Sequence, residues 1–147
     1  MRDKQMGVLC RITYPEEVDN SNILTHPKFD EELKNILEKS GFKLKFVNLF
    51  RQRLRFLGER WKNCILKKDW FEILKGTNEI YSMKFRSQKN IRILFTFTGY
   101  EEKEIALLVC SFEEKNVKNK NKDSYNKAIE VANKRLKEIE DLINKGS

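Results

Sequence analysis

The sequence contains few of the residues that build metal sites and disulfide frameworks. Its 147 residues include one histidine, His26, and three cysteines, Cys10, Cys64 and Cys110. The cysteines are far apart, odd in number and not arranged as C-x-x-C, whereas a structural zinc site needs about four Cys or His ligands. We therefore expect no metal and no cofactor, and we expect free thiols, which suit a reducing cytosol.

Long apolar runs and common catalytic motifs are also missing. The start of the chain lacks a secretory hydrophobic segment and no run is long enough to span a bilayer, so we expect a cytoplasmic protein without a membrane partner. The sequence contains no P-loop, no G-x-G-x-x-G and no G-x-S-x-G. Its carboxylates are dispersed, whereas a metal-dependent nuclease needs carboxylates that converge.

Positive charge and aromatic residues are plentiful. The formal net charge is +8, with 35% charged and 11% aromatic residues. A chain of this length buries roughly 70% of its unfolded surface, so residues 1–147 are expected to form one domain. A basic domain attracts polyanions such as RNA, DNA, an acidic membrane face or an acidic protein.

Residues 74–112 contain the clearest structural pattern. Apolar and polar residues alternate through 81–86 and 91–98, and 105–112 is apolar on both sides. Alternation that includes aromatic and β-branched residues is typical of strands. The pattern predicts a three-stranded antiparallel meander, in which the first run is an amphipathic edge strand and the last is buried on both faces.

Residues 28–61 have the apolar spacing of two helices. One apolar stripe begins at Phe29 and a second runs from Phe46 to Trp61, and Gly41 separates them. This spacing predicts a helical hairpin that covers one face of the sheet. The polar side of the second helix is expected to expose four arginines: Arg51, Arg53, Arg55 and Arg60.

The remaining segments complete an α+β fold. Residues 1–27 are expected to form an N-terminal strand, over Gly7–Tyr14, followed by a loop, while 62–73 fit either a short helix or an irregular packed segment. A C-terminal helix over 123–145, capped by Asp123 or Ser124, is expected to dock on the sheet or on a partner. The predicted fold is thus an N-terminal strand and helical hairpin on an antiparallel three- to four-stranded sheet, with a C-terminal helix.

The polar side of the meander carries cations. Lys84 and Arg86 are two residues apart on one strand and project to the same side, and Arg92 begins the next strand. Guanidinium groups bind phosphate oxygens in bidentate fashion and stabilise charge that develops in a transition state. Two interpretations stay open at this point: a phosphate site, or a solvated outer face of the sheet.

These segments resemble a known family. The motifs L-K-G-T-x-x-I-Y-x-M-K-F-R, N-I-R-I-L-F and L-L-V-C-S-F-x-E-K-x-x-K follow one another between Phe71 and Arg135. Their order and spacing are similar to those of the RelE/ParE superfamily of type II toxins, and most similar to its HigB-like, phage-derived branch. The matching positions are Tyr81, Lys84, Arg92, Phe112, Lys115 and Lys118.

The resemblance implies both a fold and an activity. The RelE-like fold has a strand, two helices, an antiparallel sheet and a variable C-terminal helix. The implied activity is that of a ribosome-dependent, metal-independent mRNA endoribonuclease, an mRNA interferase that inhibits translation. Its partners would be the ribosome, mRNA and a cognate antitoxin protein that covers the basic face.

The resemblance also assigns roles to individual residues. Four cations would be catalytic, with the arginines on the scissile phosphate and the lysines assisting: Arg86, Arg92, Lys84 and Lys115. Five further residues would contact RNA: Lys75, Lys118, Arg51, Arg55 and Tyr81. Because Tyr81 lies on the apolar side of its strand, packing in the core is an alternative role for it.

Three positions depart from the family pattern. Cys110 replaces a frequent histidine, Ser82 replaces an acidic residue and Glu114 replaces a lysine, so the sequence names no general base. An unperturbed lysine, with a pKa of about 10.4, is a poor base at neutral pH. The alternative functions are a non-enzymatic, ParE-like toxin that binds gyrase, an inactive relic that binds an antitoxin, and a generic RNA-binding module.

Overall fold

The computed structural model describes residues 8–12, 22–40, 43–86, 90–114 and 121–146, which form an α+β fold. Six strands make one mixed sheet in the order β1-β2-β6-β5-β4-β3. The elements are β1 (Cys10–Arg11), β2 (Ile23–Thr25), α2 (Phe29–Ser40), α3 (Lys43–Arg60), the 3₁₀ helix η1 (Trp61–Leu66), β3 (Phe71–Ile73), β4 (Tyr81–Arg86), β5 (Asn90–Tyr100), β6 (Lys103–Glu113) and α4 (Asn121–Gly146).

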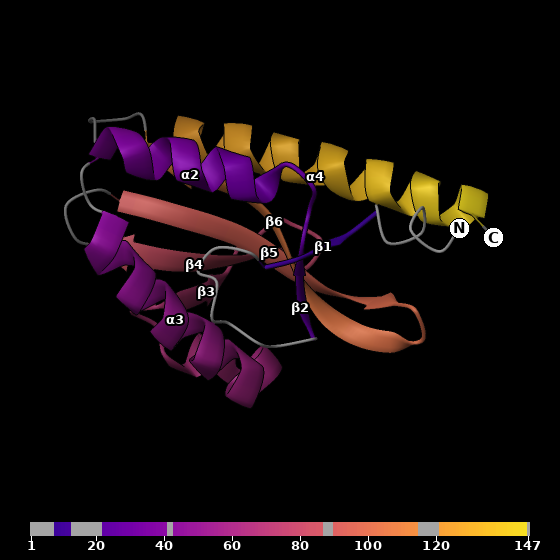
Figure 1. Cartoon of the computed structure of the whole chain (residues 1–147), viewed down its shortest axis with the longest axis horizontal. Helices are drawn as coiled ribbons and strands as arrows, with labels where there is room; N and C mark the ends of the chain where they lie inside the picture. Colours follow the sequence, from indigo (N-terminus) through magenta and orange to yellow (C-terminus); the bar gives the residue numbers. More distant parts are fainter. Residues whose placement is uncertain (1–7, 13–21, 41–42, 87–89, 115–120, 147) are drawn as a thin grey trace.

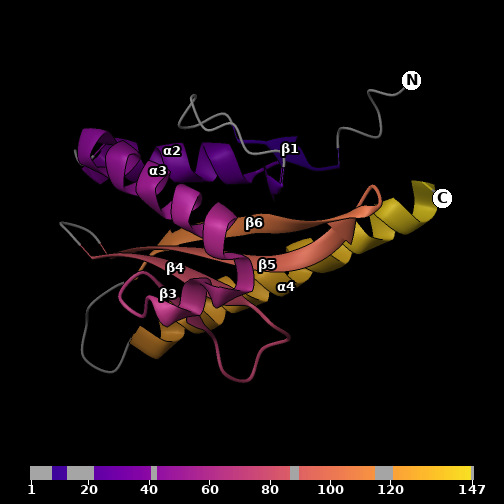
Figure 2. The same cartoon turned by 90° about the horizontal axis from the view of Figure 1, so that it is seen from below.

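Helices cover both faces of the sheet. The hairpin of α2 and α3 lies over one face and α4 lies along the other, as the two views show (Figures 1 and 2). Phe46 and Phe50 of α3 pack against Phe85 of β4 in the first layer, with ring centroids 4.5 and 6.0 Å apart. In the second layer, α4 packs on the sheet largely through Ala128, Ala132 and other small or aliphatic residues.

The predicted helical hairpin and meander are confirmed. Helices α2 and α3 both fall within the predicted hairpin of residues 28–61, and β4, β5 and β6 pair antiparallel in sequence order. Residues 105–111 are buried, as expected for a strand covered on both sides. The periodicity of the sequence was sufficient here because each of these elements buries one continuous stripe against a neighbour.

The predicted sheet was wrong in its size and in its pairing. It has six strands rather than three or four, and β2 pairs parallel with β6 through Ile23↔Ala106. Strand β3 lies outside β4, so β4 is not the edge strand. Both missed strands are three residues long, which is too short to reveal an alternating pattern.

Three segments differ from the sequence-based prediction or lie partly outside the described residues. The ambiguous segment 62–73 contains most of η1 and the strand β3, and α4 begins at Asn121, two residues before the predicted cap. Of the predicted strand Gly7–Tyr14, the described part pairs only through Cys10 and Arg11, and Gly7, Thr13 and Tyr14 lie outside the described residues.

Side chains replace a neighbouring strand along part of β6. Strand β6 makes three residue pairs with β2. Beyond them, Ser111 N donates to Glu32 Oε1 of α2 (2.9 Å), and Val109 O accepts from Arg135 Nη1 of α4 (2.9 Å). Arg135 and Glu32 also form a two-pronged ion pair at 3.0 and 3.1 Å. The pair therefore connects the two helical layers and satisfies backbone groups that an edge strand leaves open.

His26 caps the start of α2 in its neutral form. Its Nδ1 accepts a hydrogen bond from Lys28 N (3.0 Å), and its own backbone N donates to Leu108 O (3.0 Å). Burial, reinforced by the charges of Arg135 and Lys28, lowers the pKa of His26 to about 4. A protonated Nδ1 cannot accept a hydrogen bond, so the cap depends on the neutral ring.

His26 is expected to make stability depend on pH. The pKa of His26 is about 4 in the folded protein, below its ordinary value of 6.5. Between pH 4 and pH 6.5, therefore, the ring is protonated only in the unfolded chain. The stability contribution is therefore complete above pH 6.5 and falls toward pH 4, by about 3 kcal/mol. His26→Asn keeps a cap acceptor without a titrating ring, so urea denaturation across this range should show a shallower slope; an unchanged slope would contradict this assignment.

Candidate active site

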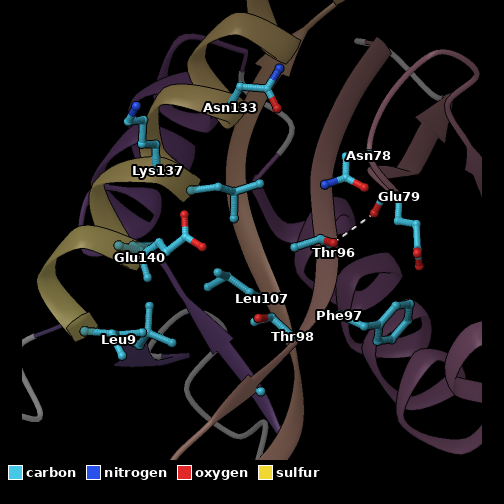
Figure 3. A pocket seen from close by; sticks show the side chains of 14 residues that line it. Leu9, Asn78, Glu79, Thr96, Phe97, Thr98, Leu107, Asn133, Lys137 and Glu140 are labelled. Atoms are coloured by element: carbon cyan, nitrogen blue, oxygen red, sulfur yellow. Dashed lines mark hydrogen bonds between the residues drawn. The ribbon is translucent and has the colours of Figure 1, made fainter. Parts of the chain in front are cut away.

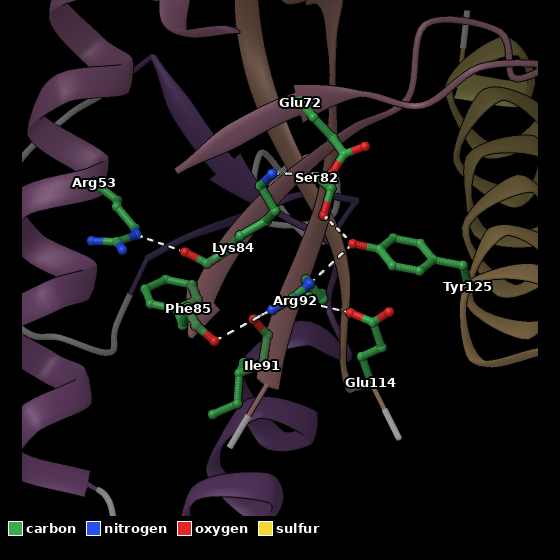
Figure 4. A network of polar contacts seen from close by, with 9 residues as sticks. All are labelled: Arg53, Glu72, Ser82, Lys84, Phe85, Ile91, Arg92, Glu114 and Tyr125. Atoms are coloured by element: carbon green, nitrogen blue, oxygen red, sulfur yellow. Dashed lines mark hydrogen bonds and ion pairs between the residues drawn. The ribbon is translucent and has the colours of Figure 1, made fainter. Parts of the chain in front are cut away.

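Two buried cations face each other on the side of the sheet that α4 covers. Lys84 of β4 is the direct cross-strand partner of Arg92 of β5, and each residue is 6% exposed. Side chains at directly opposed positions have their Cβ atoms about 5 Å apart. Figure 4 shows Lys84 reaching toward Glu72 and Arg92 lying near Tyr125, which extends from α4. The interpretation of these positions as a solvated outer face is therefore wrong for Lys84 and Arg92.

Lys84 is neutralised from the edge of the sheet. Its Nζ lies 3.2 Å from Glu72 Oε1 of β3, and the two side chains are 8% and 47% exposed. Glu72 is the direct cross-strand partner of Ser82, which lies two residues before Lys84 on β4. The pair thus brings a solvent-accessible carboxylate to the margin of a buried cation.

All three guanidinium nitrogens of Arg92 have partners. Nη2 lies 2.7 Å from Glu114 Oε1, and Nε donates to Tyr125 Oη (3.0 Å). Nη1 donates to the carbonyl oxygens of Phe85 (3.3 Å) and Ile91 (3.2 Å). An anion can therefore reach Arg92 only when Glu114 or Tyr125 moves.

Tyr125 places a phenol at the centre of this network. Its hydroxyl lies 3.1 Å from Ser82 Oγ as well as 3.0 Å from Arg92 Nε, and its ring packs edge-on against Phe112 at 5.2 Å. Burial raises the pKa of Tyr125, although its hydrogen bond to Ser82 and the charge of Arg92 act in the opposite direction. The hydroxyl is therefore protonated at neutral pH and is available as a donor.

Arg53 supports this site from the opposite layer. Its Nε donates to Lys84 O (2.8 Å), and its guanidinium lies 4.4 Å from the ring centre of Trp70 and 4.8 Å from that of Phe85. Arg53 is 6% exposed, and burial lowers its pKa to about 10. The expectation that Arg53 belongs to the exposed face of α3 is wrong, because its aliphatic stem and planar head fill the seam between α3 and β4.

The other predicted site residues do not gather with Lys84 and Arg92 in the described part of the chain. Arg51 and Arg55 lie on α3, on the opposite face of the sheet, and Lys75 is exposed in the turn after β3. Tyr81 is 5% exposed and packs on Phe95 at 5.3 Å, which is the core-packing alternative. Three residues fall outside the description, either entirely or in their side chains: Lys115, Lys118 and Arg86.

The sequence did not point to the groups that complete the network. Glu72 lies in the segment without clear periodicity, and Tyr125 lies 33 positions from its partner Arg92. Ser82 and Glu114 were noticed only as departures from the family pattern. The available signal was the alternation of β4, which places Ser82 on the same face as Lys84.

A separate cavity of about 670 Å³ opens farther along the same face of the sheet, between α4 and β5 (Figure 3). Thr96 and Thr98 of β5 and Asn133 and Lys137 of α4 line it, and Leu107 forms its floor. Thr96 Oγ1 donates to Glu79 O at 2.8 Å across one side. Its lining mixes amides, hydroxyls and charges of both signs, so it lacks the concentrated positive charge that phosphate prefers.

Comparisons with protein-family models, with curated proteins and with solved structures gave no match. No helix in the described residues has both the length and the apolar character needed to cross a membrane. Across 8–12, 22–40, 43–86, 90–114 and 121–146, no three His, Cys, Asp or Glu side chains gather as metal ligands.

Proposed function

We propose that this chain is a metal-independent endoribonuclease whose active site is the network around Lys84 and Arg92. The observation that carries the proposal is the meeting of two cations, an accessible carboxylate and a protonated phenol on one face: Glu72 lies 3.2 Å from Lys84, and Tyr125 lies 3.0 Å from Arg92. Cleavage of RNA without a metal needs a base, an acid and positive charge at the phosphate. The network contains a candidate for each of these roles.

In the proposed reaction, the RNA supplies its own nucleophile. Glu72 takes the proton of the 2′-hydroxyl, and the 2′-oxygen forms a bond to phosphorus. The bond from phosphorus to the 5′-oxygen breaks, and that oxygen takes a proton from Tyr125. Lys84 and Arg92 stabilise the charge on the non-bridging oxygens, and the products are a 2′,3′-cyclic phosphate and a 5′-hydroxyl.

RNA access requires a change from the arrangement described here. Glu114 holds Arg92 at 2.7 Å and Tyr125 lies over Ser82, so the scissile phosphate must replace Glu114 as the partner of Arg92. A phosphate and a carboxylate are similar ligands for a guanidinium group. Displacement of Tyr125 on α4 and of Glu114 after β6 would free the guanidinium of Arg92 and leave the sheet intact.

The resemblance to the RelE/ParE toxins extends the proposal to a biological role. We propose that the RNA is mRNA on the ribosome, that cleavage inhibits translation, and that a cognate antitoxin keeps the protein inactive. The order of strand, helical hairpin, meander and C-terminal helix supports this role, and so does the pairing of Lys84 with Arg92.

A second candidate function is non-enzymatic binding, as in a ParE-like toxin or an inactive toxin relic. The absence of net charge in the network favours this binding function, because Glu72 and Glu114 neutralise Lys84 and Arg92. A protein of this kind would use its surface to bind gyrase or an antitoxin, and the polar network would then have only a structural role.

Induced expression in a bacterium, with mapping of mRNA ends, tests the two functions. We expect arrested translation and new mRNA ends that carry a 5′-hydroxyl. The purified protein should produce the same ends on mRNA when ribosomes are added. Growth arrest with intact mRNA would instead indicate the binding function, and a folded protein that causes no arrest would contradict both toxin functions.

A further inference from the structure

The net charge of the protein is concentrated in one stretch of the chain. Residues 43–68, which comprise α3, η1 and the two lysines that follow η1, contain nine lysines and arginines and a single acid, Glu59, giving a net charge of +8. The rest of the chain contains 21 cations and 21 anions and is neutral. The positive pole of the protein therefore lies on α3 and the segment that follows it, and α3 lies on the face of the sheet opposite to α4 (Figure 2).

An exposed leucine lies within this positive pole. Leu66, the last residue of η1, is 78% exposed, the highest fraction among the exposed large apolar side chains of the described residues. It borders a groove of about 310 Å³ that is also lined by Phe56, Arg60, Asn63 and Lys67. An apolar side chain beside a groove with a charged rim is typical of the centre of a protein interface.

The aromatic rings near this groove are already covered by cations. The guanidinium of Arg60 lies 5.5 Å from the ring centre of Phe56, and the ammonium of Lys67 lies 4.6 Å from that of Trp70. Single-stranded RNA binds such surfaces by stacking its bases on open aromatic faces. The arrangement offers positive charge and aliphatic surface, and it does not offer the stacking platform that RNA needs.

The backbone holds Leu66 in a defined position. Trp61 begins η1 with φ of 56°, a conformation that is costly for a bulky residue. Two contacts hold it there: Trp61 Nε1 donates to Glu104 Oε1 (2.8 Å), and its ring lies 5.0 Å from that of Phe97. At the other end of η1, Lys67 N donates to Cys64 O (3.0 Å). Pre-organisation of this kind lowers the entropic cost of binding at Leu66.

We propose that the surface formed by Leu66, Phe56, Arg60 and Lys67 docks an acidic segment of a partner protein, which inserts an apolar side chain beside Leu66. The cations of α3 and η1 attract the acidic residues of this segment, and the groove excludes water from the apolar contact. The surface is separate from the proposed active site, so the inference does not depend on ribonuclease activity.

Selection of peptides on the purified full-length chain tests this inference, with a displayed library of random peptides as the probe. We expect the selected peptides to combine acidic residues with at least one large apolar residue. Leu66→Ser should weaken their binding about tenfold or more, as loss of an interface anchor does. Arg60→Gln with Lys67→Gln should weaken binding and reduce its dependence on salt.

Two matched variants serve as controls. Leu142→Ser removes another exposed leucine, 53% exposed on α4, and Lys134→Gln removes an exposed lysine from the same helix. Both should bind the selected peptides like the unaltered protein. The inference is overturned if no peptide is selected, if the peptides lack acidic residues, or if Leu66→Ser and Leu142→Ser behave alike. Tight binding of single-stranded polyuridylate that Leu66→Ser leaves unchanged, with no selected peptide, would assign this surface to nucleic acid.

Discussion

Replacing Glu72 by glutamine is expected to lower the rate of RNA cleavage by about 10²- to 10⁴-fold, the usual contribution of a general base. Glutamine keeps the shape of the side chain and can still accept a hydrogen bond from Lys84, but it cannot take a proton from the 2′-hydroxyl. The Glu72 side chain is 47% exposed, but that of Lys84 is only 8% exposed, so losing the ion pair leaves a buried ammonium with a weaker partner and should cost about 1–3 kcal/mol of stability. The loss of activity should therefore occur in a folded protein.

The measurement is the single-turnover cleavage rate on mRNA with ribosomes, alongside thermal denaturation. Glu130→Gln, which changes an exposed carboxylate in the middle of α4, is the matched control and should cleave at the unaltered rate. A folded Glu72→Gln protein with full activity would exclude Glu72 as the base. If the unaltered protein does not cleave under any of these conditions, the non-enzymatic function becomes the better explanation.

Replacing Arg92 by leucine is expected to lower the free energy of unfolding by about 3–5 kcal/mol, because it leaves a buried carboxylate without a partner. The side chains of Arg92 and Glu114 are only 7% and 15% exposed. The same change removes the donors to Phe85 O and Ile91 O and to the hydroxyl of Tyr125. A loss of activity in Arg92→Leu alone would therefore not distinguish catalysis from unfolding.

The double variant Arg92→Leu/Glu114→Leu separates these two effects. Removing both charges replaces an ion pair with apolar side chains, a change that is often neutral or stabilising, so most of the lost stability should return. We expect a folded protein without RNA cleavage, since the phosphate-binding guanidinium is missing. Urea denaturation of the unaltered protein, of Arg92→Leu, of Glu114→Leu and of the double variant gives the coupling energy. A double variant as unstable as Arg92→Leu would show that the carbonyl hydrogen bonds, and not the ion pair, carry the stability.

Local periodicity was enough to predict the helical hairpin, the three long antiparallel strands and the C-terminal helix. Each of these elements has an apolar stripe that repeats over several turns or several residue pairs, so its character is encoded within a short window. The same alternation correctly placed Tyr81 in the core and Ser82 and Lys84 on the other face. The cations of that face were therefore identifiable from the sequence.

The surroundings of those cations depend on contacts between distant segments. The short strands β2 and β3 exist because neighbouring strands extend the sheet to them, and three residues carry too little pattern to reveal this. Through β3, Glu72 reaches Lys84, and through the docking of α4, Tyr125 reaches Arg92 across 33 positions of the chain. Burial and pairing are properties of packed layers, so the pattern of one strand left both a phosphate site and a solvated face open, whereas the fold contains a covered, neutral network.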